Sequence, residues 1–152
     1  MTRPRAVLLG TFVVGTLDAL DAVVYFNASA IRIFQSIARG LLGRDAFRGG
    51  LPVAALGMAI HYFIAFSIVS VYMAASRKWP VLTQRPVVCG ALYGIGVYFF
   101  MNLVVIPLSA VGFQPFTRGP FLNGIFIHVF GIGLPSAFVS VAAARTESPQ
   151  AV

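Results

Sequence analysis

Residues 51–75 read LPVAALGMAIHYFIAFSIVSVYMAA and contain no formally charged side chain. A helix that crosses the hydrocarbon core of a bilayer needs about 20 mostly apolar residues, so this stretch is long enough to cross it. Working outward along the chain, three more stretches meet the same requirement. The predicted spans are residues 6–27, 51–75, 87–110 and 121–144. We therefore expect an all-α membrane protein, a bundle of four transmembrane helices forming one domain over residues 1–152.

The composition agrees with a bilayer as the solvent. Apolar residues make up 59% of the chain and charged residues 10%, against roughly a quarter charged in soluble domains. The net charge of +7 comes from basic residues that lie mainly between the apolar stretches. Anionic lipid headgroups attract basic residues placed in this way. The pattern therefore argues against nucleic-acid binding and predicts the lipid bilayer as the partner.

The connection between the first two spans is long and contains a short amphipathic segment. Its apolar and polar residues fall on opposite helical faces: Ile33, Phe34, Ile37 and Leu41 on one, and Arg32, Ser36 and Arg39 on the other. A helix too short and too charged to cross the membrane is expected at its interface. We predict such a helix over residues 30–42 and leave open whether it dips into the bilayer. The polar tail, residues 145–152, is expected to be disordered.

Basic residues also bear on orientation and location. Two precede the first span, three lie in the second connection and one follows the last span, which gives six on one side. The first and third connections hold four and one, which gives five on the other. The short, basic second connection favours both termini in the cytoplasm. Asp18 and Asp21 lie where a signal peptide would be cleaved, so the first span is predicted to be retained. The expected location is the bacterial inner membrane.

Polar side chains inside the spans are the candidate functional residues. An Asp near the centre of a membrane helix costs about 2.5–3.5 kcal/mol on insertion scales, so polar residues there need partners or a function. Counted from the side of the first and third connections, five of them fall in one layer roughly 9–15 Å deep. These five are Asp18, Asp21, His61, Asn102 and His128. Small residues border them at helical spacing, which is typical of faces between helices. Asn123 and Tyr98 are secondary candidates, one nearer the membrane face and one in line with Asn102.

Four interpretations of this cluster stay open. An Asp and His set can titrate near neutral pH, and it could relay protons or couple them to the movement of a cation. The two Asp and two His (Asp18, Asp21, His61 and His128) could instead bind a metal ion, although no compact ligand motif is present. His61 and His128 could ligate a b-type haem. The residues could also be structural, in a membrane subunit that binds a partner and has neither transport nor catalytic activity.

Other sequence features bear on enzymatic activity, cofactors and oligomeric state. No nucleophile elbow, phosphate-binding loop or dinucleotide fingerprint occurs, so enzymatic activity is not expected. No cofactor is predicted apart from the open metal and haem alternatives. Cys89, the only cysteine, is expected to pack inside a span. Glycine-rich faces on several spans favour a homo-oligomer. The segment from Gly131 to Pro135 could break the fourth helix beside His128.

Several segments of the sequence resemble those of a group of small uncharacterised bacterial four-span proteins. They are Gly15-x-x-Asp18-x-x-Asp21, Ile37-Ala38-x-Gly40-Leu-Leu-Gly43, the span around His61, Met101-Asn102 with Pro107-Leu-Ser109, and Asn123-Gly124 with Ile127-His128. More distantly, the second, third and fourth spans are similar to the YagU-type inner-membrane family, although this chain has shorter connections and a different first span. The resemblance implies a bacterial inner-membrane location, a loose link to acid resistance and no established biochemical activity. It adds no catalytic residues.

Overall fold

The computed structural model describes residues 1–147, and all the regular secondary structure in that range is helical. The first half contains α1 (Arg3–Tyr25), α2 (Ala30–Leu42), the 3-10 helix η1 (Gly43–Arg48) and α3 (Gly50–Lys78). The second half contains α4 (Val81–Gln84), α5 (Pro86–Phe100), η2 (Met101–Val105), α6 (Ile106–Leu108), α7 (Arg118–Ile127), η3 (His128–Gly133) and α8 (Leu134–Glu147). Both η2 and η3 are π-helical.

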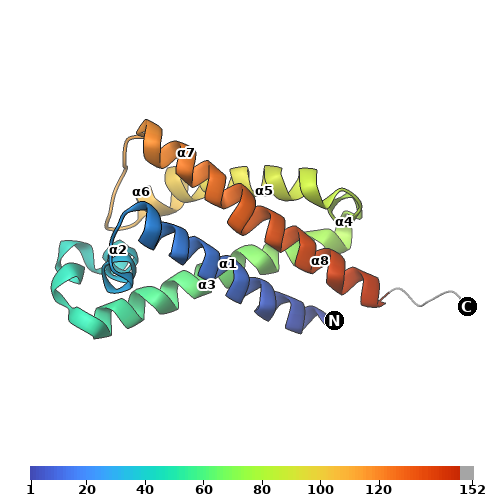
Figure 1. Ribbon diagram of the computed structural model, residues 1–152, viewed down its shortest axis with the longest axis horizontal. Coiled ribbons are helices and arrows are strands. Elements are labelled where there is room, and N and C mark those ends of the chain that lie inside the picture. The colour runs from blue at the N-terminus through green and yellow to red at the C-terminus, as the bar shows by residue number, and fades with distance from the viewer. Residues whose placement is uncertain (148–152) are drawn as a thin grey trace, which may run out of the picture.

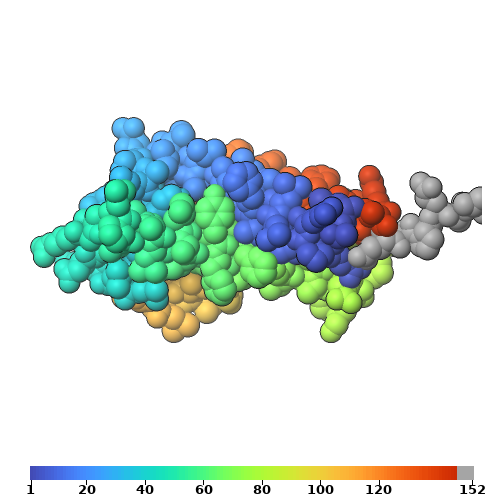
Figure 2. Space-filling model, turned by 90° about the horizontal axis from the view of Figure 1, so that it is seen from below, coloured from blue at the N-terminus to red at the C-terminus, as the bar shows by residue number. Residues whose placement is uncertain are grey.

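Four long helical segments, each called a rod below, run back and forth along the long axis of the molecule (Figure 1). Each is long and apolar enough to cross a membrane: Arg3–Tyr25, Gly50–Lys78, Pro86–Leu108 and Arg118–Thr146. The four predicted membrane helices are therefore confirmed, with ends shifted by a few residues. The N-terminus and the visible end of α8 lie at the end of the bundle that carries α4. The connection containing α2 and η1 lies at the opposite end, as the view from below also shows (Figure 2).

The side chains on the outer faces of the four long helical segments are apolar, and the residues where these segments touch one another are small. Large side chains such as Phe12, Phe63 and Phe126 are more than half exposed, as expected where lipid rather than water surrounds the helices. Inside, α5 and η3 touch backbone to backbone. A Cβ placed on Gly94 would lie 2.1 Å from the carbonyl oxygen of His128. Glycine at such a position allows close approach, which is how small residues stabilise helix pairs in membranes.

Each of the last two rods contains a π-helical segment just before a proline. The segment η2 ends two residues before Pro107, and η3 ends two residues before Pro135. Proline has no N–H to donate to the carbonyl four residues earlier, so the normal helical ladder fails there. The fourth rod consequently widens beside His128, and the break predicted between Gly131 and Pro135 is this local widening of a continuous helix.

The short helix predicted in the first connection is present as α2, with the same ends. It packs closely on α3, because a Cβ on Gly57 would lie 1.8 Å from the carbonyl oxygen of Phe34. The predicted division into an apolar and a polar face holds only in part. Leu41 is 68% exposed, whereas Arg39 is half-buried with its Nε atom enclosed. The cause is that α2 folds against the end of the bundle and does not present one flat face.

The C-terminal helix is longer than predicted. It continues through Glu147, three residues past the predicted end of the fourth span. The first three residues of the predicted disordered tail are therefore helical, since the i to i−4 ladder continues to them, and Thr146 donates its hydroxyl proton to the carbonyl of Ala142. The remaining part of that prediction, residues 148–152, lies outside the described residues.

The bundle is not closed evenly on all sides. The rod α3 packs on α1, α2 and α8, and α5 packs on η3 and α8. Between α3 and α5 there is little backbone contact in the described chain. The Tyr93 hydroxyl donates to the carbonyl of Ile68 (2.7 Å), and the rings of Tyr72 and Tyr93 pack edge to face with 5.0 Å between their centres. Away from these two tyrosines, the side of the bundle between the two helices is open.

Candidate functional site

His61 is held between α3 and α1 by a backbone carbonyl. Its Nε2 atom lies 2.7 Å from the carbonyl oxygen of Gly15, and its side chain is buried. A carbonyl oxygen can only accept a hydrogen bond, so Nε2 carries the proton. The other ring nitrogen, Nδ1, is then the atom that can gain or lose a proton.

That free nitrogen faces the carboxylate of Asp18. His61 Nδ1 and Asp18 Oδ2 are 3.9 Å apart, and their side chains are 10% and 31% exposed. Within the described chain no donor lies within hydrogen-bond distance of the Asp18 carboxylate. An acid and a base placed in this way can share one proton, which resides on either the carboxyl group or the imidazole. The pair is neutral or doubly ionised according to where the proton sits.

His128 lines the same cavity as Asp18 and is close enough to interact with it electrostatically. Its Nδ1 atom donates to the carbonyl of Gly124 (2.9 Å), four residues earlier in the same rod. Its ring packs edge-on against Tyr98, with 5.3 Å between ring centres. Because the carbonyl fixes the proton on Nδ1, the lone pair of the neutral ring lies on Nε2.

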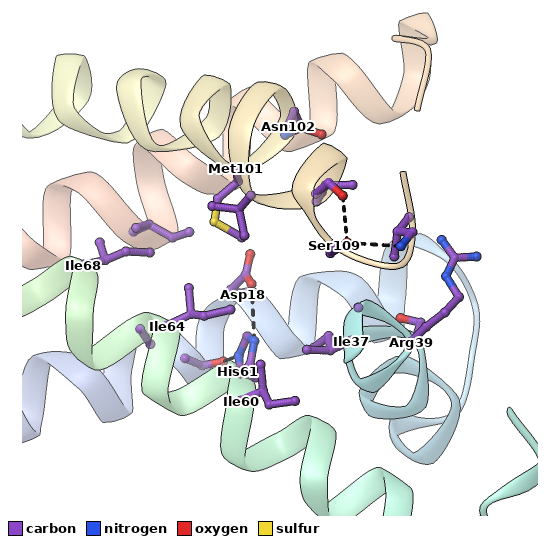
Figure 3. A pocket seen from close by; sticks show the side chains of 18 of the residues that line it. Asp18, Ile37, Arg39, Ile60, His61, Ile64, Ile68, Met101, Asn102 and Ser109 are labelled. Atoms are coloured by element: carbon purple, nitrogen blue, oxygen red, sulfur yellow. Dashed lines mark hydrogen bonds and ion pairs between the residues drawn. The ribbon is translucent and has the colours of Figure 1, made fainter. Parts of the chain in front are cut away.

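A cavity of about 460 Å³ collects these groups (Figure 3). Asp18, His61, His128 and Asn102 line it, and most of the other lining side chains are aliphatic. In Figure 3 the Asp18 carboxylate stands between His61 below and Met101 above. Asn102 does not turn its amide to the acid, since its Nδ2 atom donates to the carbonyl of Tyr98 (2.8 Å) in its own rod.

The structure separates the fifth member of the predicted cluster from the other four. Asp21 does not line the cavity, and its Oδ2 accepts a hydrogen bond from Asn123 Nδ2 (2.8 Å). Asn123 therefore ties α7 to α1. Tyr98, the other secondary candidate, is buried against His128 and fills the space left by Gly124. Both secondary residues support the helices around the cavity and do not line it.

Sequence reasoning missed the polar residues at the outer end of the cavity, namely Ser36, Arg39, Ser109 and Gln114. The sequence predicts Arg39 on the polar face of an interfacial helix. Its guanidinium Nε is in fact buried without a hydrogen-bond partner in the described chain. The side chain projects away from Asp18 (Figure 3). The burial of Arg39 depends on the fold, because the loop before α7 covers α2. The hydrogen bond from Ala110 N to the Gly40 carbonyl (2.9 Å) holds that loop in place.

The metal and haem alternatives depend on how many ligands converge. In residues 1–147 no group of three or more His, Cys, Asp or Glu side chains is arranged to hold a metal ion. Asp18 and His61 offer two ligands, and Asp21 is occupied by Asn123. For haem, His61 Nε2 is already bonded to a carbonyl. The arrangement is suited to exchanging a proton and to holding a cation against a carboxylate.

Comparison of the chain with protein-family models, curated proteins and solved structures gave no match. The resemblance to the YagU-type family therefore stays a prediction, and the function has to be argued from the site itself.

Proposed function

We propose that this chain is a bacterial inner-membrane protein that binds and releases a proton at the Asp18–His61 pair and couples that proton to the movement of a cation through the cavity. The observation that carries the proposal is the hydrogen bond from His61 Nε2 to Gly15 O. That bond leaves Nδ1 facing Asp18 at 3.9 Å. This geometry supports one exchangeable proton between the two side chains.

The cost of burying a carboxylate supports a functional role. An ionised Asp inside a bilayer is expensive unless it is paired, and such residues commonly mark ion or proton paths. Asp18 has no hydrogen-bond donor in the described chain, and its neighbours around the cavity are mainly aliphatic. The carboxylate therefore depends on a proton, on water or on a cation inside the cavity.

The same fold supports a proposal for the orientation in the membrane. Both ends of the described chain lie on the side of α4, where Arg77, Lys78 and Arg85 are exposed. We propose that this side faces the cytoplasm, in accordance with the preference of basic residues for that side. The helix α2 would then lie at the opposite interface and cover the outer end of the cavity.

A second function, a structural subunit that binds a partner or a second copy of the chain, is favoured by one observation. Asn102 and His128 both direct a polar hydrogen to a carbonyl of their own rod. Polar residues satisfied in this way need no ligand. Asp18 is not satisfied in this way, so we rank proton-linked transport first.

The test of proton binding uses the fact that the chain contains two histidines. Nitrogen-15 spectra of histidine-labelled protein in lipid should show two imidazoles. We expect one whose Nε2 stays protonated while Nδ1 titrates, and we assign it to His61. Asp18→Asn should move that titration. Asp21→Asn, the same change three residues away and outside the cavity, should have a smaller effect than Asp18→Asn. If Asp18→Asn leaves the His61 signal unchanged, the two residues do not share a proton.

Transport is tested separately in proteoliposomes that contain a pH-sensitive dye. An imposed cation or proton gradient should give protein-dependent proton movement that Asp18→Asn abolishes and Asp21→Asn retains. If the parent protein moves no protons, coupled transport is wrong and the structural subunit is favoured.

A further inference from the structure

A long apolar groove runs along the open side of the bundle between α3 and α5. Its volume is about 800 Å³. Its lining is almost wholly apolar: Ile64, Ser67, Ile68, Val71, Leu82, Cys89, Leu92, Tyr93, Gly96, Val97, Phe100, Met101 and Val105. Exposed members such as Val71, Leu92 and Phe100 belong to the outer surface of the spans. In a membrane this groove therefore faces the lipid.

The groove and the Asp18 cavity lie next to each other and share four lining residues. Both are lined by Ile64 and Ile68 of α3 and by Met101 and Val105 of η2. All four shared side chains are apolar. A path from the groove to the Asp18 cavity would run past these four apolar side chains.

We propose that the groove and cavity form a binding site for a lipophilic organic cation, with its apolar body against α3 and α5 and its positive charge at Asp18. This inference rests on the proposed function and names the cation that the proton is coupled to. The volumes fall in the range of about 300–1,000 Å³ that small-molecule sites occupy. An inorganic cation would need several oxygen ligands, and the cavity lining contributes one carboxylate among mainly aliphatic groups.

The charges around the site explain why entry comes from the lipid. The connection over the outer end of the cavity carries Arg32, Arg39, Arg44 and Arg48 against one acid, Asp45. Arg39 itself lines the cavity there. A cation approaching from that end would be repelled. A cation partitioned into the bilayer meets no like charge in the groove.

Binding should compete with the proton. The charged or titratable groups facing Asp18 are His61 on α3, His128 on η3 and Asp21 on its own helix, with Arg39 of α2 at the cavity end. When the Asp18–His61 pair holds its proton, the site offers no free negative charge. A bound cation therefore displaces that proton. Where the pair is protonated, the apparent Kd should rise about tenfold for each unit that the pH falls.

The test uses tetraphenylphosphonium, a permanent lipophilic cation, and tetraphenylborate, an anion of the same shape. Binding to the full chain in phosphatidylcholine nanodiscs is measured by equilibrium dialysis against protein-free nanodiscs. We expect saturable binding of the cation and no saturable binding of the anion. Each bound cation should release one proton. Asp18→Asn should lower the affinity for the cation at least tenfold. Asp21→Asn, which removes a nearby charge but keeps the cavity carboxylate, should lose less affinity than Asp18→Asn. Equal binding of the anion, or an unaffected Asp18→Asn variant, overturns the proposal.

A second test changes the groove and leaves Asp18 in place. Gly96 lines the groove, and a Cβ placed there meets no atom within 4 Å. Gly96→Leu should therefore fold, fill the groove and weaken cation binding at least tenfold, while the histidine spectrum stays as in the parent. Ala142→Leu, on an exposed part of α8 outside the groove, is the matched control. Unchanged binding in Gly96→Leu overturns the lateral site.

The two proposals fail in different ways. A parent protein whose His61 titrates with Asp18 but binds no tetraphenylphosphonium disproves the cation site and keeps the proton site. A parent that binds the cation through Asp18 without releasing a proton disproves the proton coupling and keeps the cation site.

Discussion

The imidazole of His61 donates a hydrogen bond of 2.7 Å to the backbone carbonyl of Gly15 on the neighbouring helix. Gly15 also leaves room for the next residue of α3, because a Cβ there would lie 2.6 Å from Cε1 of Tyr62. The Tyr62 hydroxyl in turn lies 3.0 Å from Thr16 Oγ1. The contact between α1 and α3 thus fixes the protonated nitrogen of His61 and, with it, the atom that faces Asp18.

Replacing His61 by Phe should weaken the association of α1 with α3. Polar bonds between membrane helices are worth about 0.6 kcal/mol on average and at most about 1.7 kcal/mol, so the loss should lie in that range. Reversible unfolding in mixed micelles measures it. His128→Phe is the control, because its bond to Gly124 stays within one rod. Equal losses in the two variants would contradict the role of His61 between helices.

Two glycines of α5 that are two residues apart should respond in opposite ways to alanine. At Gly94 the new Cβ would lie 2.1 Å from a backbone oxygen of His128, and at Gly96 it meets open space. Gly94→Ala should cost about 1–3 kcal/mol of unfolding free energy, as overpacking does. Gly96→Ala should be neutral or slightly stabilising, because alanine favours helix. The same unfolding assay measures both. A neutral Gly94→Ala would show that α5 and η3 are not in backbone contact.

Asp21 and Asn123 should be energetically coupled across α1 and α7, since they share a hydrogen bond of 2.8 Å. A double-mutant cycle with Asp21→Leu and Asn123→Leu should give an interaction energy of about 0.6 kcal/mol. The matched cycle of Asp18→Leu with Asn123→Leu should give none, because that carboxylate faces the cavity. Coupling of similar size in both cycles would place the two acids in one network.

The docking of α2 should depend on Gln35. This side chain is buried, and its Nε2 donates to the carbonyl of Gly50 (3.1 Å) at the start of α3. Gln35→Met keeps the volume and removes the bond, whose net worth is about 0.5–1.5 kcal/mol. Amide exchange in α2 should therefore accelerate roughly two- to twelvefold, as hydrogen-exchange mass spectrometry measures. Gln114→Met, in an exposed loop, should leave α2 unchanged.

Much of the site could be predicted because depth in the membrane follows from counting residues along a straight helix. Asp18, His61, Asn102 and His128 were expected at one level, and all four line one cavity. Their hydrogen bonds could not be predicted in the same way. The orientation of each side chain depends on the rotation of its helix and on local backbone shape, such as the π-helical segment that begins at His128.

The sequence by itself determined the four membrane helices and the levels of their polar residues, because an apolar stretch of sufficient length has one favourable solvent and a helix has a fixed rise per residue. Tertiary structure alone decided the rest. It paired Asp18 with His61 and Asp21 with Asn123, although the two acids lie three residues apart on one helix. It also left few backbone contacts between α3 and α5, where the apolar groove lies. These outcomes depend on close contacts between helices. Glycines that are far apart in the sequence allow those contacts, because a Cβ at their positions would clash.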